Sequence, residues 1–440
     1  MSCNYWSCGN SDFFEKTKRN FTMKVRIGII GCARILNAHL RGYKILQENG
    51  FGDLFQITAL CARKEEDAHR FQKRGEGPGP RPAPVDAPGD PLNAPHSFIS
   101  DLHPDSDAEV YTNYNEMLEK GKIDAVIILT GHDNHHSIAI DAMRAGKHVS
   151  VEKPMAISVK AAQRMCEVAD ETGQILSIDE NVNFNPSTWA SQWAVEKGLI
   201  GDVQMLYRGV IGFRNSRPDL VAARTPWRQS KLGAGGGVAI DLGVHLFNGV
   251  RTICGPVKSI QALWRTLEPV RVLMSDDDRA IIDQIENQVD DAFFANFEFE
   301  NGGIGHMAVS RSARGTQVGV PGGTNIWGSK GAISDGQLFG EDGTSENVED
   351  RFQREADPSR ISEVMPRGIT DAFALENLNW LQAIANGKPI QMSGEEGTID
   401  LALSYAILES GMLGRAVTLD EMLKGEVDGY QKEINDYYGL

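Results

Sequence analysis

The chain has 440 residues, 41% hydrophobic and 24% charged, a composition typical of a folded protein with room for two or three domains. Its 60 acidic and 44 basic residues give a formal net charge of −16, which argues against nucleic acid and anionic membranes as partners and favours a small-molecule ligand. No apolar run is long enough to cross a bilayer, so no membrane association is expected.

The first 22 residues do not resemble a secretory signal, because they lack an apolar core. Met23 directly precedes the first strand-like run, so we interpret residues 1–22 as an N-terminal tail. The cysteines show neither a CxxC pair nor a metal-like spacing, which favours reduced thiols, a cytoplasmic protein and no metal site. They are Cys3, Cys8, Cys32, Cys61, Cys166 and Cys254.

From residue 24 the sequence alternates between strand-like and helix-like segments. Apolar, β-branched runs predict strands at 24–30, 55–62, 123–131, 147–154 and 174–181. Helical spacing predicts helices at 34–47, 65–73, 114–121, 135–146 and 158–172. Strands separated by amphipathic helices indicate an α/β fold with a doubly wound parallel sheet, so we expect a nucleotide-binding domain at 23–180.

Residues 74–107 interrupt this alternation with eight of the 18 prolines and several glycines. Such a stretch extends neither neighbouring element, and we interpret it as a surface insertion. A charged stretch at about 341–367 is predicted to be a second loop.

The pattern changes near residue 181. Long strand-like runs joined by turns predict an open, largely antiparallel sheet, interrupted by one helix at 235–250. Two further helices are expected at 371–388 and 397–414. We therefore expect residues 181–440 to form a substrate-binding and oligomerisation domain, whose C-terminal helices pack back on the first domain.

The turn after the first strand, "RIGIIGCARIL", lies where a dinucleotide's pyrophosphate meets a helix N-terminus. Read as G-x-G-x-x-G it keeps only one glycine, so a plain strand-to-helix turn is an equal alternative. The candidate cofactor-binding residues are Gly28, Gly31, Cys32, Ala33, Arg34 and Ile35.

The second strand ends in Ala62, Arg63 and Lys64 instead of the acid that binds the ribose of NAD. Two cations without a carboxylate favour the 2′-phosphate of NADP, so NADP is preferred over NAD. The alternative is that both charges are solvated at a helix start.

Polar residues also follow the third and fourth long strands. Thr130, His132 and His135 either face the cofactor or cap the next helix. Glu152 and Lys153 end a buried strand, where burial would make the lysine a tunable proton donor or electrostatic clamp. The alternative is a surface ion pair of little consequence.

Within 235–250, Asp241, His245 and Asn248 are spaced i, i+4 and i+7, which places them on one stripe of a helix that is otherwise apolar. Buried charge is costly without partners, so the stripe faces either a polar core network or a cleft.

These motifs in this order resemble the glucose-fructose oxidoreductase / inositol dehydrogenase / rhizopine-catabolism (Gfo/Idh/MocA) family. The resemblance covers roughly 23–423, and its specific signal is the combination of EKP in "VEKPMA" with D-x-G-x-H in "GGGVAIDLGVHLFN". It implies an N-terminal Rossmann domain, followed by an α/β domain whose open sheet lies beneath the nicotinamide and often forms an oligomer interface.

The resemblance also implies roles for individual residues. Lys153 matches the family's EKP lysine, and Asp241 and His245 match its D-x-x-x-H pair. The chain departs from the family pattern at six residues. Ala33 and Ala62 replace a glycine and an acid, Gly131 and His132 replace Pro and Asn, Asn183 stands where Arg is frequent, and Asn248 stands where Asp is more common.

We therefore expect reversible hydride transfer between the nicotinamide and a secondary alcohol of a sugar, cyclitol or related polyol. His245 would be the base, Asp241 would orient it or bind a hydroxyl, and Lys153 would stabilise the alkoxide. A glycoside-cleaving enzyme that retains its cofactor, or a non-catalytic NADP sensor, are the alternatives. A homo-oligomer through the open sheet is expected. The candidate substrate-binding residues are Lys153, Asn181, Trp227, Arg228, Asp241, His245 and Asn248.

Overall fold

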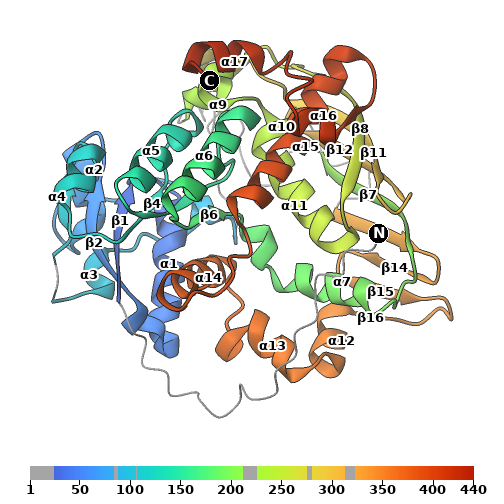
Figure 1. The fold of residues 1–440 in the computed structure, drawn as a ribbon, viewed down its shortest axis with the longest axis horizontal. Coiled ribbons are helices and arrows are strands. Elements are labelled where there is room, and N and C mark those ends of the chain that lie inside the picture. The colour runs from blue at the N-terminus through green and yellow to red at the C-terminus, as the bar shows by residue number, and fades with distance from the viewer. Residues whose placement is uncertain (1–23, 84–87, 106, 212–224, 275–279, 313–322) are drawn as a thin grey trace.

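The computed structural model describes residues 24–83, 88–105, 107–211, 225–274, 280–312 and 323–440. The predicted tail, residues 1–22, lies outside the described residues. Figure 1 shows a first domain, blue to teal, beside a second domain that contains the large sheet, with helix α15 between them.

The first domain is built on six parallel strands in the order β3-β2-β1-β4-β5-β6. Its strands are β1 Val25–Ile30, β2 Phe55–Cys61, β3 Glu109–Tyr111, β4 Ala125–Ile128, β5 His148–Glu152 and β6 Leu176–Asp179. Its main helices are α1 Leu36–Leu46, α2 Glu65–Gln72, α4 Tyr114–Lys120, α5 His132–Arg144 and α6 Val159–Thr172. The short segments η1 Gln47–Phe51 and η2 Gly52–Leu54 follow α1. The predicted doubly wound sheet is confirmed, with β3 as an additional edge strand.

The strand residues are apolar because the sheet is covered on both faces. All four residues of β4 are buried, as are the side chains of Ile27 and Ile29 in β1. The insertion at 74–107 forms two short helical segments, η3 Pro91–Asn93 and α3 Ile99–Leu102. Ile99 and Leu102 are buried in the core of the domain, so the end of the insertion is packed against it.

The second domain contains a nine-stranded sheet in the order β16-β15-β14-β13-β7-β12-β11-β8-β17. Only the β7–β12 pair is parallel, so the prediction of an open, largely antiparallel sheet is confirmed. Its strands are β7 Val203–Ile211, β8 Val257–Arg265, β11 Ala292–Phe299, β12 Ile304–Ser310, β13 Gly323–Gly328, β14 Gly331–Ser334, β15 Gln337–Gly340, β16 Ser345–Asn347 and β17 Val417–Thr418. A separate hairpin, β9 Val270–Met274 and β10 Ile281–Glu286, was not predicted.

Helices cover one face of this sheet and connect it to the first domain. α15 packs on β8, α11 packs on α7 and α15, and α14 packs on α1 of the first domain. The helical segments are η4 Asn181–Phe184, α7 Pro186–Glu196, η5 Pro226–Gln229, α9 Lys231–Ala234, α10 Val238–Asp241, α11 Gly243–Cys254, α12 Val348–Glu355, α13 Pro358–Val364, η6 Pro366–Gly368, α14 Ala372–Asn386, α15 Gly394–Leu413, α16 Leu419–Leu423 and α17 Lys432–Tyr438. None of the helices in the described part of the chain is long and apolar enough to span a membrane.

Two predicted elements differ in the structure. The stretch at 341–367 was expected to be a loop, but it contains β16, α12 and α13. Asn347 caps α12. Val348 and Phe352, spaced i and i+4, are buried, so the burial of a short apolar stripe stabilises a helix in this charged sequence. The helix at 235–250 is not continuous, because Leu242 separates α10 from α11.

Candidate active site

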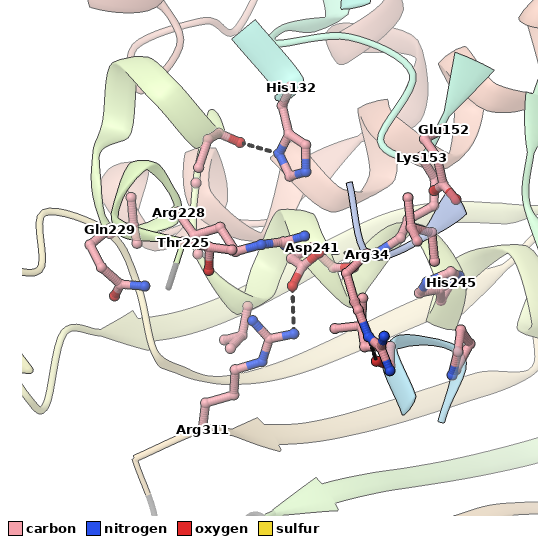
Figure 2. A pocket seen from close by; sticks show the side chains of 18 of the residues that line it. Arg34, His132, Glu152, Lys153, Thr225, Arg228, Gln229, Asp241, His245 and Arg311 are labelled. Carbon is pink, nitrogen blue, oxygen red and sulfur yellow. Dashed lines mark hydrogen bonds and ion pairs between the residues drawn. The ribbon is translucent and has the colours of Figure 1, made fainter. Parts of the chain in front are cut away.

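A cavity of about 370 Å³ opens between the two domains. Its first-domain wall comes from the segments that follow β1, β4, β5 and β6, which is the edge where ligands bind in doubly wound sheets. Helices α10 and α11 and the end of β12 form the opposite wall. Figure 2 shows side chains from both walls pointing into the same space.

The turn between β1 and α1 is shaped for close approach of a backbone or ligand. Gly31 has φ +106°, and a Cβ added there would lie 2.4 Å from the carbonyl oxygen of Leu129, so only glycine fits. Arg34 and Ile35 continue from this turn into the cavity wall. Gly28, Cys32 and Ala33 belong to the same segment but do not line the cavity. The turn therefore has the form required to hold a pyrophosphate at the start of α1.

Arg34 connects this turn to the insertion. Its guanidinium donates to the carbonyl oxygens of Leu92 at 2.7 Å and Ala94 at 3.0 Å. Because Asp90, Pro91 and Leu92 also line the cavity, the insertion is part of the cavity's wall and not only a surface excursion.

The end of β2 places Ala62, Arg63 and Lys64 beside the first turn of α2. Ala62 is buried, whereas the Arg63 and Lys64 side chains are exposed, and none of the three lines the cavity. The two cations lie at the position where a doubly wound sheet meets the adenine ribose.

Thr130, His132 and His135 all line the cavity, and both imidazoles are buried. His135 has its ring nitrogens 2.9 Å from the carbonyl oxygen of Pro154 and 3.2 Å from that of Thr130, so it joins two strand ends. His132 Nδ1 lies 3.0 Å from the carbonyl oxygen of Ala234. Burial lowers the pKa of both histidines, that of His132 strongly, which favours neutral rings.

Asp241 lies at the centre of a cluster of cations. Its carboxylate accepts from Lys153 Nζ at 3.0 Å, Arg228 Nη1 at 2.9 Å and Arg311 Nη2 at 2.5 Å (Figure 2). Burial alone would raise the pKa of Asp241, but the charges of Lys153, Arg228 and Arg311 outweigh it and hold that pKa well below its usual range. Asp241 is therefore a carboxylate and the electrostatic centre of this wall.

His245 lies one turn into α11 and has a different acidic partner. Its Nδ1 is 2.5 Å from Oε1 of Glu180, whose side chain is only 2% exposed. A carboxylate only accepts hydrogen bonds, so Nδ1 donates to it and the neutral ring keeps Nε2 unprotonated. Of the two roles expected for Asp241, orienting His245 or binding a hydroxyl, the first does not fit the structure, because the ring contacts Glu180.

Two more carboxyl groups lie behind Lys153. Glu152 forms an ion pair with His39 at 3.1 Å. Burial would raise the pKa of Glu152, but the His39 partner lowers it below its ordinary value. Asp179 is bonded to the Ser150 hydroxyl, and burial raises its pKa to about 6.

Five of the seven predicted substrate-binding residues line the cavity. They are Lys153, Asn181, Arg228, Asp241 and His245. Trp227 lies behind it and packs on His132, with ring centroids 4.8 Å apart.

Asn248 is placed elsewhere, because its amide donates at 2.9 Å to Asp400 and is 1% exposed. Asn248 is thus part of a polar core network, which was the alternative interpretation of the stripe, and we do not include it among the substrate residues.

Glu180 and Arg311 were missed by sequence reasoning. Glu180 directly follows β6 at the ligand-binding edge, which was a usable signal. Arg311 follows β12, 70 residues from Asp241, and nothing local in the sequence marks it.

Comparison with known proteins agrees with this architecture. A model of an oxidoreductase family with an NAD-binding Rossmann fold (Gfo/Idh/MocA) matches residues 94–180, and a model of the Gfo/Idh/MocA C-terminal domain matches residues 190–334. Together these two matches span more than half of the chain.

Curated relatives cover most of the sequence. The chain is 25% identical over 400 residues to myo-inositol 2-dehydrogenase of Thermotoga maritima, covering 91% of the chain and 100% of the relative. It is 27% identical over 318 residues to D-glucoside 3-dehydrogenase of Escherichia coli, covering 71% of the chain and 84% of the relative.

Solved structures share the fold. An oxidoreductase of Thermotoga maritima superposes with a TM-score of 0.66 at 24% identity, covering 91% of this chain and 100% of that one. A levoglucosan dehydrogenase in complex with NADH and levoglucosan gives a TM-score of 0.68 at 18% identity, covering 90% of this chain and 100% of that one.

Proposed function

The chain belongs to the Gfo/Idh/MocA family of NAD-binding oxidoreductases, and on this basis we propose that it oxidises a secondary alcohol of a sugar, cyclitol or related polyol. The relatives that carry names are dehydrogenases or reductases of such compounds, among them inositols and glucosides. The observation that carries the proposal is one cavity in which Lys153, Asp241 and His245 lie together beside the Gly31 turn.

The residues of the first domain fit a nicotinamide dinucleotide. The backbone at Gly31 tolerates no side chain, and the N-terminus of α1 beside it favours a pyrophosphate. Arg34, Ile35, Thr130, His132, His135 and Glu152 would line the remainder of the cofactor's path towards Lys153. When bound, the dinucleotide supplies the two-electron hydride acceptor for the alcohol carbon.

His245 is the residue that accepts the proton of the alcohol in this mechanism. Because Nδ1 donates to Glu180, Nε2 carries the lone pair that accepts the hydroxyl proton. Glu180 holds the ring and stabilises its protonated form, so Glu180 is a positioning residue. In the direction of reduction the same nitrogen returns the proton to the oxygen.

Lys153 stabilises negative charge on the substrate oxygen. Its ammonium is held by the side chain of Asp241 and by the backbone carbonyl of Asp241 at 2.9 Å, so the donor is fixed before the reaction begins. A pre-oriented cation in a partly buried cavity stabilises a developing alkoxide more than a mobile one does. Asn181 and Arg228 are positioned to bind neighbouring hydroxyl groups.

Substitution of the two reacting side chains tests the proposal. We expect His245→Ala and Lys153→Ala to lower kcat by about 100-fold or more, because removal of a general base or of a charge stabiliser costs that much. The dissociation constant of the dinucleotide, measured by fluorescence titration, should stay close to wild type. Full activity of both variants, assayed at 340 nm on the best substrate of a sugar and inositol panel, would falsify this mechanism.

We also propose a preference for NADP over NAD. Support comes from the end of β2, where Arg63 and Lys64 are exposed and the ribose-binding acid of NAD enzymes is replaced by Ala62. NAD remains the established cofactor class of the family.

A second copy of the chain is proposed to cover the outer face of the large sheet. Ile304, Met205 and Trp327 are direct cross-strand neighbours on β12, β7 and β13, and Phe294 pairs with Leu263 on β11 and β8. Directly opposite residues share a face, and all five side chains are more than 40% exposed. An apolar face of this extent is typical of a subunit interface.

A further inference from the structure

The Asp241 wall carries more positive than negative charge. One carboxylate is shared by Lys153, Arg228 and Arg311, so this cluster has an excess of two positive charges. Such an excess of charge among partly buried side chains favours a ligand that brings negative charge.

Two carboxylates of the same cavity wall, Asp290 and Asp291, are engaged by other partners. Asp290 is buried and accepts the backbone N–H groups of Gly237 at 2.6 Å and Ala239 at 2.7 Å. Asp291 accepts two backbone N–H groups at 2.7 and 2.8 Å and pairs with Arg271. Asp290 therefore holds the backbone at the start of α10, and Asp291 holds the segment after β8; no hydrogen bond in the described part of the chain joins either side chain to Arg228 or Arg311.

Arg228 and Arg311 keep donors for a ligand. Each gives a single nitrogen to Asp241, and within the described part of the chain neither guanidinium has another hydrogen-bond acceptor. Their side chains are 26% and 28% exposed, and both line the cavity; in Figure 2 they lie on the side of Asp241 that faces away from His245. The guanidinium of Arg228 lies 4.6 Å from the ring centroid of Trp227, which restricts its plane.

Building on the proposed function, we propose that the polyol oxidised in this cavity carries an anionic group, a carboxylate or a phosphate monoester, bound by Arg228 and Arg311. A guanidinium presents paired N–H donors that match the oxygens of both groups. The anionic group takes no part in the electron transfer. It binds on the arginine side of Asp241, while the alcohol that reacts lies on the side of Lys153 and His245.

A matched set of three sugars tests this with the NADP-loaded enzyme: D-glucose, D-glucuronate and D-glucose 6-phosphate. We expect at least one anionic sugar to bind at least 10-fold more tightly than glucose in calorimetric titrations, and to be oxidised with the higher kcat/KM. The two anionic arms distinguish a carboxylate site from a phosphate site.

Variants test whether Arg311 binds the anionic group. Arg311→Gln should weaken binding of the preferred anionic sugar by about 10- to 100-fold, the range expected for one charged hydrogen-bonding partner, and weaken glucose binding by a clearly smaller factor. Arg311→Lys should retain part of the affinity. Arg265→Gln is the matched control, because Arg265 is exposed on β8 and lies outside the cavity lining, and it should leave every value unchanged.

The outcomes separate this inference from the function it builds on. If neither anionic sugar binds more tightly than glucose, or if Arg311→Gln weakens all three ligands equally, the anion site is refuted while polyol oxidation stands. If an anionic sugar binds through Arg311 but no sugar or inositol reduces the cofactor, hydride transfer is refuted and the anion site stands.

Discussion

Glu180→Gln is the substitution that separates positioning of His245 from its chemistry. The amide keeps the size of the side chain but removes the charge 2.5 Å from the imidazole. A hydrogen bond to a charged group contributes about 1.5 to 3 kcal/mol, and at an effective dielectric constant of about 20 two unit charges about 4 Å apart interact by about 4 kcal/mol. Taking about 2 to 3 kcal/mol for the lost stabilisation of the protonated ring, we expect kcat to fall by about 30- to 150-fold.

The assay is initial-rate dinucleotide reduction at saturating substrate and cofactor, combined with cofactor titration. A merely structural loss would lower cofactor affinity and thermal stability as well, whereas loss of positioning lowers kcat alone. Glu376→Gln is the matched control, because Glu376 is another buried carboxyl group that makes no contact with His245. The reasoning is refuted if Glu180→Gln keeps kcat within twofold of wild type, or if the control loses as much.

Three further predictions concern stability, cofactor and assembly. Burial raises the pKa of Glu376 well above its usual range. At pH values between the unfolded and the folded pKa, the native state retains a proton that the unfolded chain releases, so the free energy of unfolding falls as pH rises. Glu376→Gln should therefore gain unfolding free energy over wild type from pH 5 to pH 8, at up to about 1.4 kcal/mol per pH unit in urea melts; a constant difference would contradict this. Combining Arg63→Ala with Lys64→Ala should weaken NADPH binding by about 10-fold, with NADH within about twofold, and equal losses would exclude a phosphate contact. Phe294→Asp should reduce the mass in light scattering to that of a monomer, and a monomeric wild type would refute the sheet interface.

Strands and helices whose sequence pattern is local were predictable from the sequence. Alternating apolar strands and amphipathic helices predict the sheet of the first domain, because each element must bury its own apolar face. For Lys153, which follows β5, and His245 in α11, the local pattern also allowed a surface ion pair and a polar core network, and the resemblance to the family's motifs decided between them.

The contacts that define the site were not predictable in the same way. Glu180 and His245 are 65 residues apart, and their contact depends on how the two domains meet. Asn248 shows the opposite error: it lies one turn after His245 on the same helix, α11, but there the amide donates to Asp400 of α15 instead of reaching the cavity. Spacing predicts which residues share a face of a helix, but not which element that face meets at each turn.

The two acids beside the proposed reacting groups, Glu180 and Asp241, differ in their partners and therefore in the roles that we propose for them. Glu180 is buried and contacts one nitrogen of a ring that changes its charge during turnover in the proposed mechanism. Asp241 holds three groups that keep their charge, and its oxygens are divided among them. Because Lys153 shares Asp241 with both arginines, a ligand anion that draws the arginines away would leave Asp241 more fully to Lys153. If both proposals hold, anion binding and the position of the Lys153 ammonium are coupled through one carboxylate.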